Sequence, residues 1–478
     1  MNSIFSNIAK DSLIYGLARA SNRFVSILLV PMYTRIFSSA QYGVIDLIGA
    51  VFSFLGLIIN LGLSEALFFF FYNYKEKGFG TEKKLNGTIL IFKIFLNFIV
   101  SATFILFSEE LSLLLFDSDN YQRLIIMSSI TTFFANLNGF FSTIFRLNKQ
   151  PIIYLKVHLL TLFLSVLLSI YFVLILKLGL NGAFLASLIS TIISFIISIF
   201  YAYRYLNFKI EIKLLIMCLQ YGIPLVPGAL SIWIMNISNR FFINNYCSIE
   251  DLGLYSISFK IAALIGFITF ALRMALGPIL FELASKASDN DPRGIYFEIF
   301  NRYLAILCFM TISLSLFSIE LLKIFTTPEY YSAEKIVYFL CIANVGYGLA
   351  QITSLGIVLT KNTKFESLSN MLGALLSVIL NFILIPEYGL HGAAVSSAIS
   401  ILFINISLYF FSNKFYNLNF KFNLLTKLFI FSVLTYIISR YLIELSLINI
   451  IFKISIIICY MILVRLLGLF NLTMLDTN

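Results

Sequence analysis

The sequence predicts an all-α integral membrane protein with about 14 transmembrane helices, and two observations lead to this prediction. The 478 residues are 60% hydrophobic and only 12% charged, with a mean hydropathy of +0.95, whereas soluble domains carry roughly 25% charged residues. Apolar runs long enough to cross the hydrocarbon core, about 20 residues, recur along the whole chain. These observations exclude most classes of soluble enzyme. The formal net charge of +10 does not indicate nucleic acid as a partner, because the basic residues are too thinly spread.

The apolar runs are separated by charged or turn-forming residues. We count fourteen of them, and a merged or split pair would give thirteen or twelve. No small-x-small cleavage site follows the first run, so we expect it to stay as an uncleaved span. The first seven runs lie near Ser12–Val30, Tyr42–Ser64, Leu85–Phe107, Gln122–Phe145, Ile152–Leu176, Leu180–Tyr203 and Leu214–Met235. The second seven lie near Gly253–Leu272, Tyr296–Phe317, Ala333–Thr360, Phe365–Leu384, Leu390–Phe411, Leu424–Tyr441 and Leu447–Leu469.

The loops alternate in charge, and this alternation predicts the orientation of the chain. The termini and the loops after even-numbered spans hold 21 of the 33 Lys and Arg residues. The odd loops and their margins hold eight, among them Lys453, and one of them carries the acids Glu109, Glu110, Asp117 and Asp119. Because positively charged loops stay in the cytoplasm, both termini are predicted to be cytoplasmic.

Two glycine-containing stretches indicate an internal repeat. Residues 178–190 and 388–400 agree at seven of thirteen positions, at an offset of 210 residues, and the same offset places Gly43 on Gly253. An offset of six spans keeps both halves in one orientation, so the repeat predicts two six-helix lobes related by a parallel pseudo-twofold axis, plus two C-terminal helices. The predicted parts are residues 1–205 for the N-terminal lobe, 206–412 for the C-terminal lobe and 413–478 for the last two spans.

The Gly-x-x-Gly-Ala pattern in both stretches is typical of helix ends that approach a neighbouring helix closely, and direct contact with substrate is the alternative interpretation. Pro224 and Pro227 occur early in the seventh span, where they leave backbone groups without helical partners. The two prolines are consistent either with a bending gate or with a fixed kink.

Span one contains the clearest candidate site. Arg19, Asn22 and Arg23 recur with small and polar residues at three- and four-residue spacing, which places them on one helix face. An ionised side chain at the bilayer centre costs about 2.5–3.5 kcal/mol, so it needs a partner or a function. Arg19 is shallow enough to snorkel, whereas Arg23 is not. We interpret the arginines as a cationic wall that binds an anionic substrate, and a structural pair with a buried acid is the alternative.

Further intramembrane charges lie on spans two, three and eight. In span two, Asp46 and Asn60 lie near one face of the helix, and Glu65 lies at its cytoplasmic end. Asp46 is close enough to the outer margin to be a solvated helix start instead of a cavity residue. Lys93 is expected to snorkel to the cytoplasmic face from span three. Lys260 lies some eight residues inside span eight, and we assign it with Arg19 and Arg23 to the cationic cavity.

Polar side chains are candidates to complete the cavity or to bind a coupling ion, although each one alone is more typical of an interhelical hydrogen bond. Besides Asn22, Asp46, Glu65 and Lys93, they are Asn136, Asn138, Asn236, Asn239, Arg240, Asn344 and Gln351. The intramembrane charges are four bases and two acids, and this surplus favours an anion. Arginine suits phosphate because its guanidinium binds bidentately.

The chain has no motif that indicates an enzyme. It contains no P-loop, no dinucleotide fingerprint and no HExxH sequence. Its five cysteines are dispersed without metal spacing, and its two histidines do not make a metal site by themselves. We therefore predict no cofactor, no metal and no catalytic residue, and expect an ion gradient, the membrane potential or the substrate gradient to supply energy.

Three segments carry a family resemblance: PMYTR at residues 31–35, QYGVID at residues 41–46, and the paired Gly-x-x-Gly-Ala stretches. The sequence resembles the Wzx-type flippases of polysaccharide repeat units, which belong to the multidrug/oligosaccharidyl-lipid/polysaccharide exporter superfamily. The resemblance covers essentially the full length. It implies alternating access between two six-helix lobes around a cationic cavity, with Arg19, Arg23 and Lys260 fitting that cavity by location.

The resemblance also implies a substrate and a cellular location. The substrate is an oligosaccharide linked to undecaprenyl pyrophosphate, moved from the inner to the outer leaflet of the bacterial inner membrane for O-antigen or capsule synthesis. A polysaccharide polymerase and a chain-length regulator are the implied protein partners. Two other interpretations stay open: a cation- or proton-coupled multidrug antiporter on the same scaffold, and an O-antigen polymerase, which the lack of a large external loop disfavours.

Overall fold

The computed structural model describes residues 16, 29–76, 78, 80–270, 272, 293–360, 362–416, 422–439 and 447–469. In these ranges the chain is helical and contains no strand. It divides into two compact units. Unit 1 comprises Met1–Phe37 and Val44–Trp233, and unit 2 comprises Ser38–Gly43 and Ile234–Asn478. Helices α3 (Ser39–Asn60) and α11 (Val226–Ile237) therefore contribute residues to both units.

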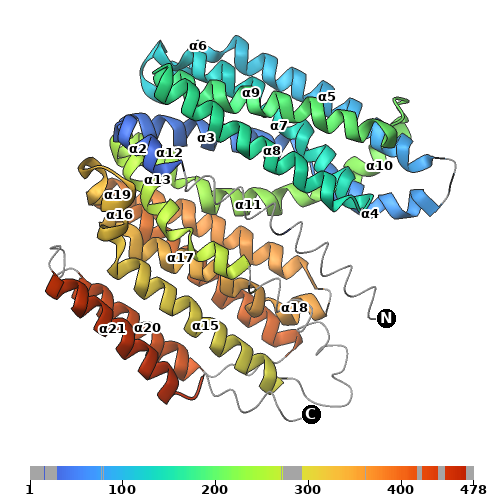
Figure 1. The fold of residues 1–478 in the computed structure, drawn as a ribbon. Helices are drawn as coiled ribbons and strands as arrows, with labels where there is room; N and C mark the ends of the chain where they lie inside the picture. The colour runs from blue at the N-terminus through green and yellow to red at the C-terminus, as the bar shows by residue number, and fades with distance from the viewer. Residues whose placement is uncertain are drawn as a thin grey trace. The chain divides into compact units, whose positions relative to one another are not determined.

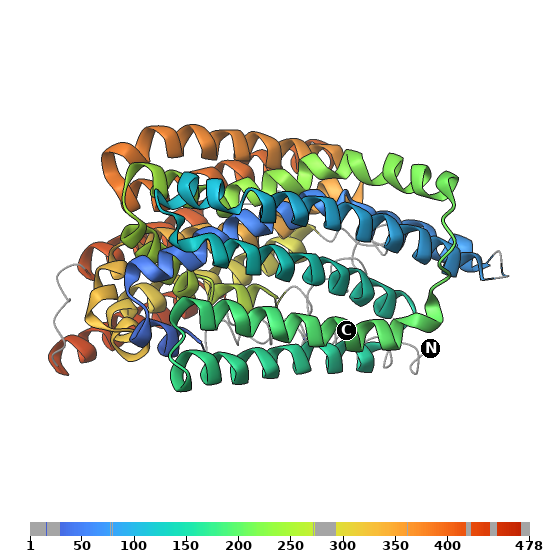
Figure 2. The same cartoon turned by 90° about the horizontal axis from the view of Figure 1, so that it is seen from above.

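Unit 1 is a bundle of long apolar helices. Helices α5, α7, α8 and α9 run side by side in both views, drawn in blue to green (Figure 1 and Figure 2). The core between them is rich in phenylalanine and leucine, with Phe71, Phe140 and Phe141 fully buried. Besides α3 and α11, the helices of unit 1 are α2 (Val30–Ile36), α4 (Leu63–Glu76), α5 (Thr81–Leu106), α6 (Ser108–Phe116), α7 (Gln122–Leu147), α8 (Pro151–Ser169), α9 (Gly179–Ala202) and α10 (Ile212–Gly222).

Unit 2 is a second helical bundle, in which α15, α17 and α19 pack together and α20 and α21 pack against α15 (Figure 1). A 3-10 turn at Pro328–Ala333 precedes α17. The helices of this unit are α12 (Asn239–Tyr246), α13 (Ile249–Ala262), α15 (Arg293–Leu316), α16 (Ser318–Phe325), α17 (Glu334–Thr353), α18 (Leu355–Leu359), α19 (Lys364–Phe415), α20 (Phe422–Ser439) and α21 (Leu447–Leu466).

Eleven helices in the described ranges are long and apolar enough to cross a membrane. Ten of the predicted runs, the second to the tenth and the fourteenth, each coincide with one of these helices, which confirms a multi-pass membrane protein. The eleventh and twelfth runs share α19, and the thirteenth contains a shorter apolar helix, Lys427–Ile438. Most of the first run lies outside the described residues, so the count of 14 stays a prediction.

Gly389 divides the long helix α19 into two antiparallel spans. Its backbone is non-helical, with φ 55° and ψ −131°, a left-handed φ that glycine adopts without a steric penalty. Residues before and after the turn contact one another: Ser369 Oγ lies 2.9 Å from Ser407 Oγ, and Ser396 Oγ donates to the Ser377 carbonyl oxygen at 3.3 Å. The predicted eleventh and twelfth spans are thus a hairpin.

The repeated glycines occupy equivalent positions in the two units. Gly179 and Gly389 both have positive φ, 58° and 55°. A Cβ atom at Gly182 would lie 2.9 Å from the Phe172 carbonyl oxygen, and one at Gly392 would overlap the Leu384 carbonyl oxygen. The close approach of helix ends predicted from the Gly-x-x-Gly-Ala pattern is confirmed, because each second glycine packs against the backbone of the preceding helix.

Two helix breaks meet inside unit 1. Leu61 and Gly62 have positive φ, 46° and 67°, and separate α3 from α4. The 3-10 turn at Ile223–Leu225, which contains Pro224, separates α10 from α11. Gly62 and Gly222 pack backbone to backbone, since a Cβ atom on either one would overlap the other segment. The prolines of the seventh span therefore mark a break in the helix, as their backbone chemistry predicts.

Candidate polar sites within the two units

Seven of the ten predicted site residues lie in the described part of the chain. The other three, Arg19, Asn22 and Arg23, lie outside it, so the cationic wall of span one stays a prediction. The seven described residues are Asp46, Glu65, Lys93, Asn236, Asn239, Lys260 and Asn344.

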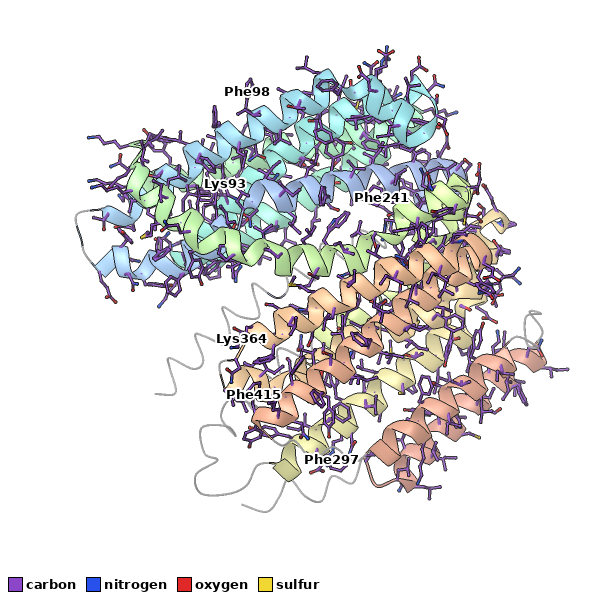
Figure 3. All side chains as sticks on the ribbon, turned by 180° about the vertical axis from the view of Figure 1, so that it is seen from behind. Lys93, Phe98, Phe241, Phe297, Lys364 and Phe415 are labelled. Carbon is purple, nitrogen blue, oxygen red and sulfur yellow. The ribbon has the colours of Figure 1, made fainter. Side chains whose placement is uncertain are left out.

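Lys93 is the centre of a polar cluster in unit 1. It lies midway along α5 and is only 3% exposed, so the expectation that it snorkels to the cytoplasmic face is wrong. Figure 3 shows Lys93 among the helices of unit 1, whereas Phe98 on the same helix projects outward and is 65% exposed. The Lys93 ammonium donates to Asn60 Oδ1 at 2.8 Å and lies 5.8 Å from the centroid of the Phe140 ring.

Asn60 links the buried lysine to an exposed carboxylate. Its Nδ2 donates to Glu65 Oε2 at 3.2 Å, and its Oδ1 also accepts from Ser64 Oγ at 2.8 Å. The break at Leu61 and Gly62 lies between Asn60 and Glu65, and it turns α4 so that the two side chains meet. The structure therefore brings together two predicted site residues, Lys93 and Glu65, through an amide that the sequence placed on the polar face of span two.

The same cluster continues along α5 to α7. Asn97 is fully buried, and its Nδ2 donates to the Lys93 carbonyl oxygen at 2.7 Å. Asn136 on α7 donates to Asn97 Oδ1 at 3.1 Å. Asn97 was not predicted, and an asparagine four residues from a lysine in an otherwise apolar run is the signal that would have found it.

Asn239 is the centre of a neutral network in unit 2. It is fully buried, and its Nδ2 lies within 3.0 Å of Tyr255 Oη, the Ala393 carbonyl oxygen and Ser397 Oγ. Its Oδ1 accepts from Asn381 Nδ2 at 2.9 Å. This network ties α12 to α13 and to both arms of the α19 hairpin. Asn381 was missed by sequence reasoning, and its only signal is an amide in the middle of an apolar run.

Arg240 and Lys260, two of the candidate cations from the sequence, both contact aromatic rings in unit 2. Arg240 is 5% exposed, its Nη1 donates to the Asn236 carbonyl oxygen at 2.8 Å, and its guanidinium lies 5.1 Å from the Phe259 ring centroid. Lys260 is half-buried on α13, donates to Tyr42 Oη and lies 4.7 Å from the Tyr42 ring centroid. Cation–π contacts of this kind are stronger where water is excluded.

Tyr42, which accepts the Lys260 hydrogen bond, lies in the first turn of α3, and this turn is bonded to other parts of unit 2. Ser39 donates both its backbone N–H and its hydroxyl to Glu329 Oε1, at 2.7 and 2.6 Å, and a carboxylate at a helix N-terminus is favourable because of the helix dipole. Gly43 and Gly253 allow the backbones of α3 and α13 to touch, since an added Cβ would overlap the carbonyl oxygens of Ile249 and Ser39 respectively. Glu329 was not predicted as a site residue.

The remaining predicted residues are Asn344, Asn236 and Asp46. Asn344 donates to the Leu340 carbonyl oxygen of its own helix at 2.9 Å, so this bond lies within one helix and does not link two helices. Asn236 offers its backbone carbonyl to Arg240. Asp46 is half-buried on α3. In the described residues no group of three or more His, Cys, Asp or Glu side chains is placed to hold a metal ion.

Comparisons with solved structures identify the fold. The lipid II flippase MurJ in its inward closed conformation matches with a TM-score of 0.74 and 18% identity, over 95% of this chain and 99% of that chain. An inward-facing MATE multidrug resistance transporter of the MOP superfamily matches with a TM-score of 0.66 and 16% identity, over 84% and 97%. A mutant of the Vibrio cholerae MATE transporter VcmN matches with a TM-score of 0.60 and 14% identity, over 87% and 98%.

Comparison of the sequence identifies the family. No curated protein matches the chain. Residues 32–335 match the model of a family described as polysaccharide biosynthesis protein, and this match spans more than half of the chain. The predicted helical membrane fold and the predicted link to polysaccharide biosynthesis proteins are both confirmed by these findings. The chain therefore belongs to the polysaccharide biosynthesis protein family, with a fold similar to that of the lipid II flippase MurJ and of MATE transporters.

Proposed function

We propose that this protein is a flippase that moves oligosaccharide repeat units, linked to undecaprenyl pyrophosphate, across the bacterial inner membrane for O-antigen or capsule synthesis. The observation that carries the proposal is the polysaccharide biosynthesis family match over residues 32–335. The fold shared with a lipid II flippase supports a lipid-linked substrate. An integral protein that carries large polar headgroups past the bilayer core must hide them from lipid, and alternating access between two lobes provides this.

The site that we propose for the pyrophosphate is cationic. Arg19 and Arg23 on the predicted first span would bind the phosphates bidentately, and Lys260 would contribute a point charge from α13. In unit 2 the Lys260 ammonium is half-buried and held by Tyr42. The polyprenyl tail would stay in the bilayer.

We propose the inner membrane as the location, with both termini in the cytoplasm, because the basic residues concentrate in the loops assigned to that side. A polysaccharide polymerase and a chain-length regulator would then receive the substrate at the outer leaflet. No part of this cycle requires the protein to make or break a covalent bond, so we propose a transporter and not an enzyme.

A cation- or proton-coupled multidrug antiporter is the second candidate, and the fold shared with MATE transporters is the observation that favours it. The positive surplus of intramembrane charge argues against it, because a cationic drug needs carboxylate partners. Efflux of a fluorescent cationic drug from cells that express the chain separates the two candidates.

Deletion of the gene, followed by chain-length analysis of surface polysaccharide, tests the proposed function. We expect no surface polysaccharide, whereas loss of a polymerase would leave single repeat units. Expression of the wild-type chain should restore the polysaccharide, and so should Lys213→Gln, which neutralises an exposed lysine. Arg23→Gln should not restore it, although the variant reaches the membrane in equal amount. Normal polysaccharide with Arg23→Gln would contradict the phosphate-binding role.

A further inference from the structure

Among the residues that the structure describes, two lysines are buried, and their surroundings are opposite. Lys453 is 1% exposed and lies 2.6 Å from Glu320 Oε1, so its charge is paired. Lys93 is 3% exposed, and its acceptor is the neutral amide oxygen of Asn60. Among the described residues, no carboxylate lies within ion-pair distance of Lys93. A buried ammonium without a counter-ion is unstable in its charged form, because burial removes its hydration.

Lys93 lies beside a buried apolar core. Its ammonium is 5.8 Å from the centroid of the Phe140 ring, and Phe140 belongs to a core that also contains Leu90 and Leu137. Asn60 accepts its hydrogen bond whether the nitrogen is an ammonium or a neutral amine, since both carry N–H donors. A neutral Lys93 side chain therefore keeps its hydrogen bond to Asn60 after it has lost a proton and its positive charge. The geometry suits a group that changes its protonation state in place.

Glu65 connects this buried nitrogen to water. It is exposed at the start of α4, and Asn60 contacts it and Lys93 at once. Of the other elements packed around α5, α7 contributes Asn136, through Asn97, and α10 contributes the buried thiol of Cys218 to the same core. The charged residues on these elements are exposed or lie elsewhere: Glu109 and Glu110 on α6, Arg123 on α7 and Arg204 in the turn Tyr203–Tyr205 are exposed, and Arg146 of α7 lies over the Phe68 ring.

We propose that Lys93 is the proton-binding residue of unit 1 and that Glu65 exchanges its proton with the aqueous phase. A proton from water binds the Glu65 carboxylate. The Glu65 O–H bond then breaks as an N–H bond forms on Lys93, leaving a carboxylate and an ammonium. The step requires Glu65 on α4 to approach Lys93 about the left-handed turn at Leu61 and Gly62. Coupling of this step to transport rests on the proposed function.

The only tryptophan of the chain gives a readout that needs no substrate. Trp233 Nε1 donates to Ser53 Oγ at 2.9 Å, and its ring lies 4.8 Å from that of Phe54. Ser53 and Phe54 lie on α3 about two turns before Asn60. A change in the charge of Lys93 acts on Asn60 and hence on the same helix. Fluorescence of Trp233 in the purified chain in nanodiscs is therefore titrated with pH.

We expect a pH-dependent fluorescence transition in the wild type and in Lys453→Arg, which keeps the other buried lysine site charged. Lys93→Met and Lys93→Arg should both abolish it, because methionine cannot bind a proton and arginine cannot release one. A structural role for the positive charge would leave the transition intact in Lys93→Arg. A wild type without any transition, or Lys93→Arg with the wild-type transition, would overturn the proposal.

Transport measurements separate this proposal from the proposed function. In proteoliposomes, flipping of a fluorescent undecaprenyl-pyrophosphate oligosaccharide by the wild type should respond to an imposed pH gradient. Lys93→Arg should lose the response to the gradient and retain downhill flipping. Gradient-driven flipping that persists in Lys93→Arg contradicts coupling through Lys93. Absence of flipping in every chain contradicts the proposed function, and the fluorescence titration then decides the role of Lys93 alone.

Discussion

The position of each buried polar residue in this protein is explained by the group to which it bonds. The charge pattern placed Lys453 at the outer margin of the last span, yet the structure buries it against Glu320 on α16, 133 residues away in sequence. Lys93 was placed near the cytoplasmic face, yet Asn60 retains it inside unit 1. The sequence shows that such residues are costly in a membrane, but long-range partners are set by packing and cannot be deduced from spacing along one helix.

The Lys453–Glu320 ion pair predicts that removing one of the two charges lowers stability more than removing both. Glu320→Gln leaves an uncompensated buried ammonium and should lower stability by about 3–5 kcal/mol, less to the extent that Glu320 stays partly exposed. The double variant Lys453→Met with Glu320→Leu removes both charges and should regain most of that loss. Thermal unfolding of the purified variants measures this, and a double variant less stable than Glu320→Gln alone would contradict the ion pair.

At the scale of helices, the sequence repeat predicted which positions are equivalent but not which ones touch. The offset of 210 residues matched Gly179 with Gly389, and both adopt left-handed backbone at a helix start. It also matched Gly43 with Gly253. In unit 2 these two glycines pack against each other, where α13 meets the first turn of α3. A sequence repeat identifies equivalent positions, whereas the contact between these two glycines within unit 2 could be found only from the coordinates.

This contact predicts a difference between two glycines of one helix. An alanine at Gly43 would overlap the Ile249 carbonyl oxygen, whereas nothing lies within 4 Å of a Cβ at Gly49. Gly43→Ala should therefore cost about 1–3 kcal/mol or more, as overpacking does, and Gly49→Ala should be neutral or slightly stabilising. Thermal unfolding and restoration of surface polysaccharide in the deletion strain check both variants. Equal behaviour of the two would contradict the close packing of α3 on α13.

For the whole molecule, composition and the positions of apolar runs were enough to predict a multi-pass helical fold. Ten runs coincide with one helix each because a span of about 20 apolar residues is dictated by the thickness of the bilayer. The runs on either side of Gly389 were correctly separated, because Pro386, Glu387 and Gly389 interrupt the apolar sequence. The candidate site was predicted less completely, since Arg19 and Arg23 are known only from sequence and Glu329 and Asn381 carried no distinctive signal.

The central claim is that this chain moves a lipid-linked oligosaccharide between leaflets, and reconstitution tests it most directly. Purified protein is placed in vesicles that contain a fluorescent undecaprenyl-pyrophosphate oligosaccharide, and dithionite then bleaches the label exposed outside. The account predicts bleaching of label from both leaflets with the wild-type chain and only the outer-leaflet fraction with Arg23→Gln. Bleaching limited to the outer leaflet with the wild-type chain, together with uptake of a cationic drug by the same vesicles, would contradict it.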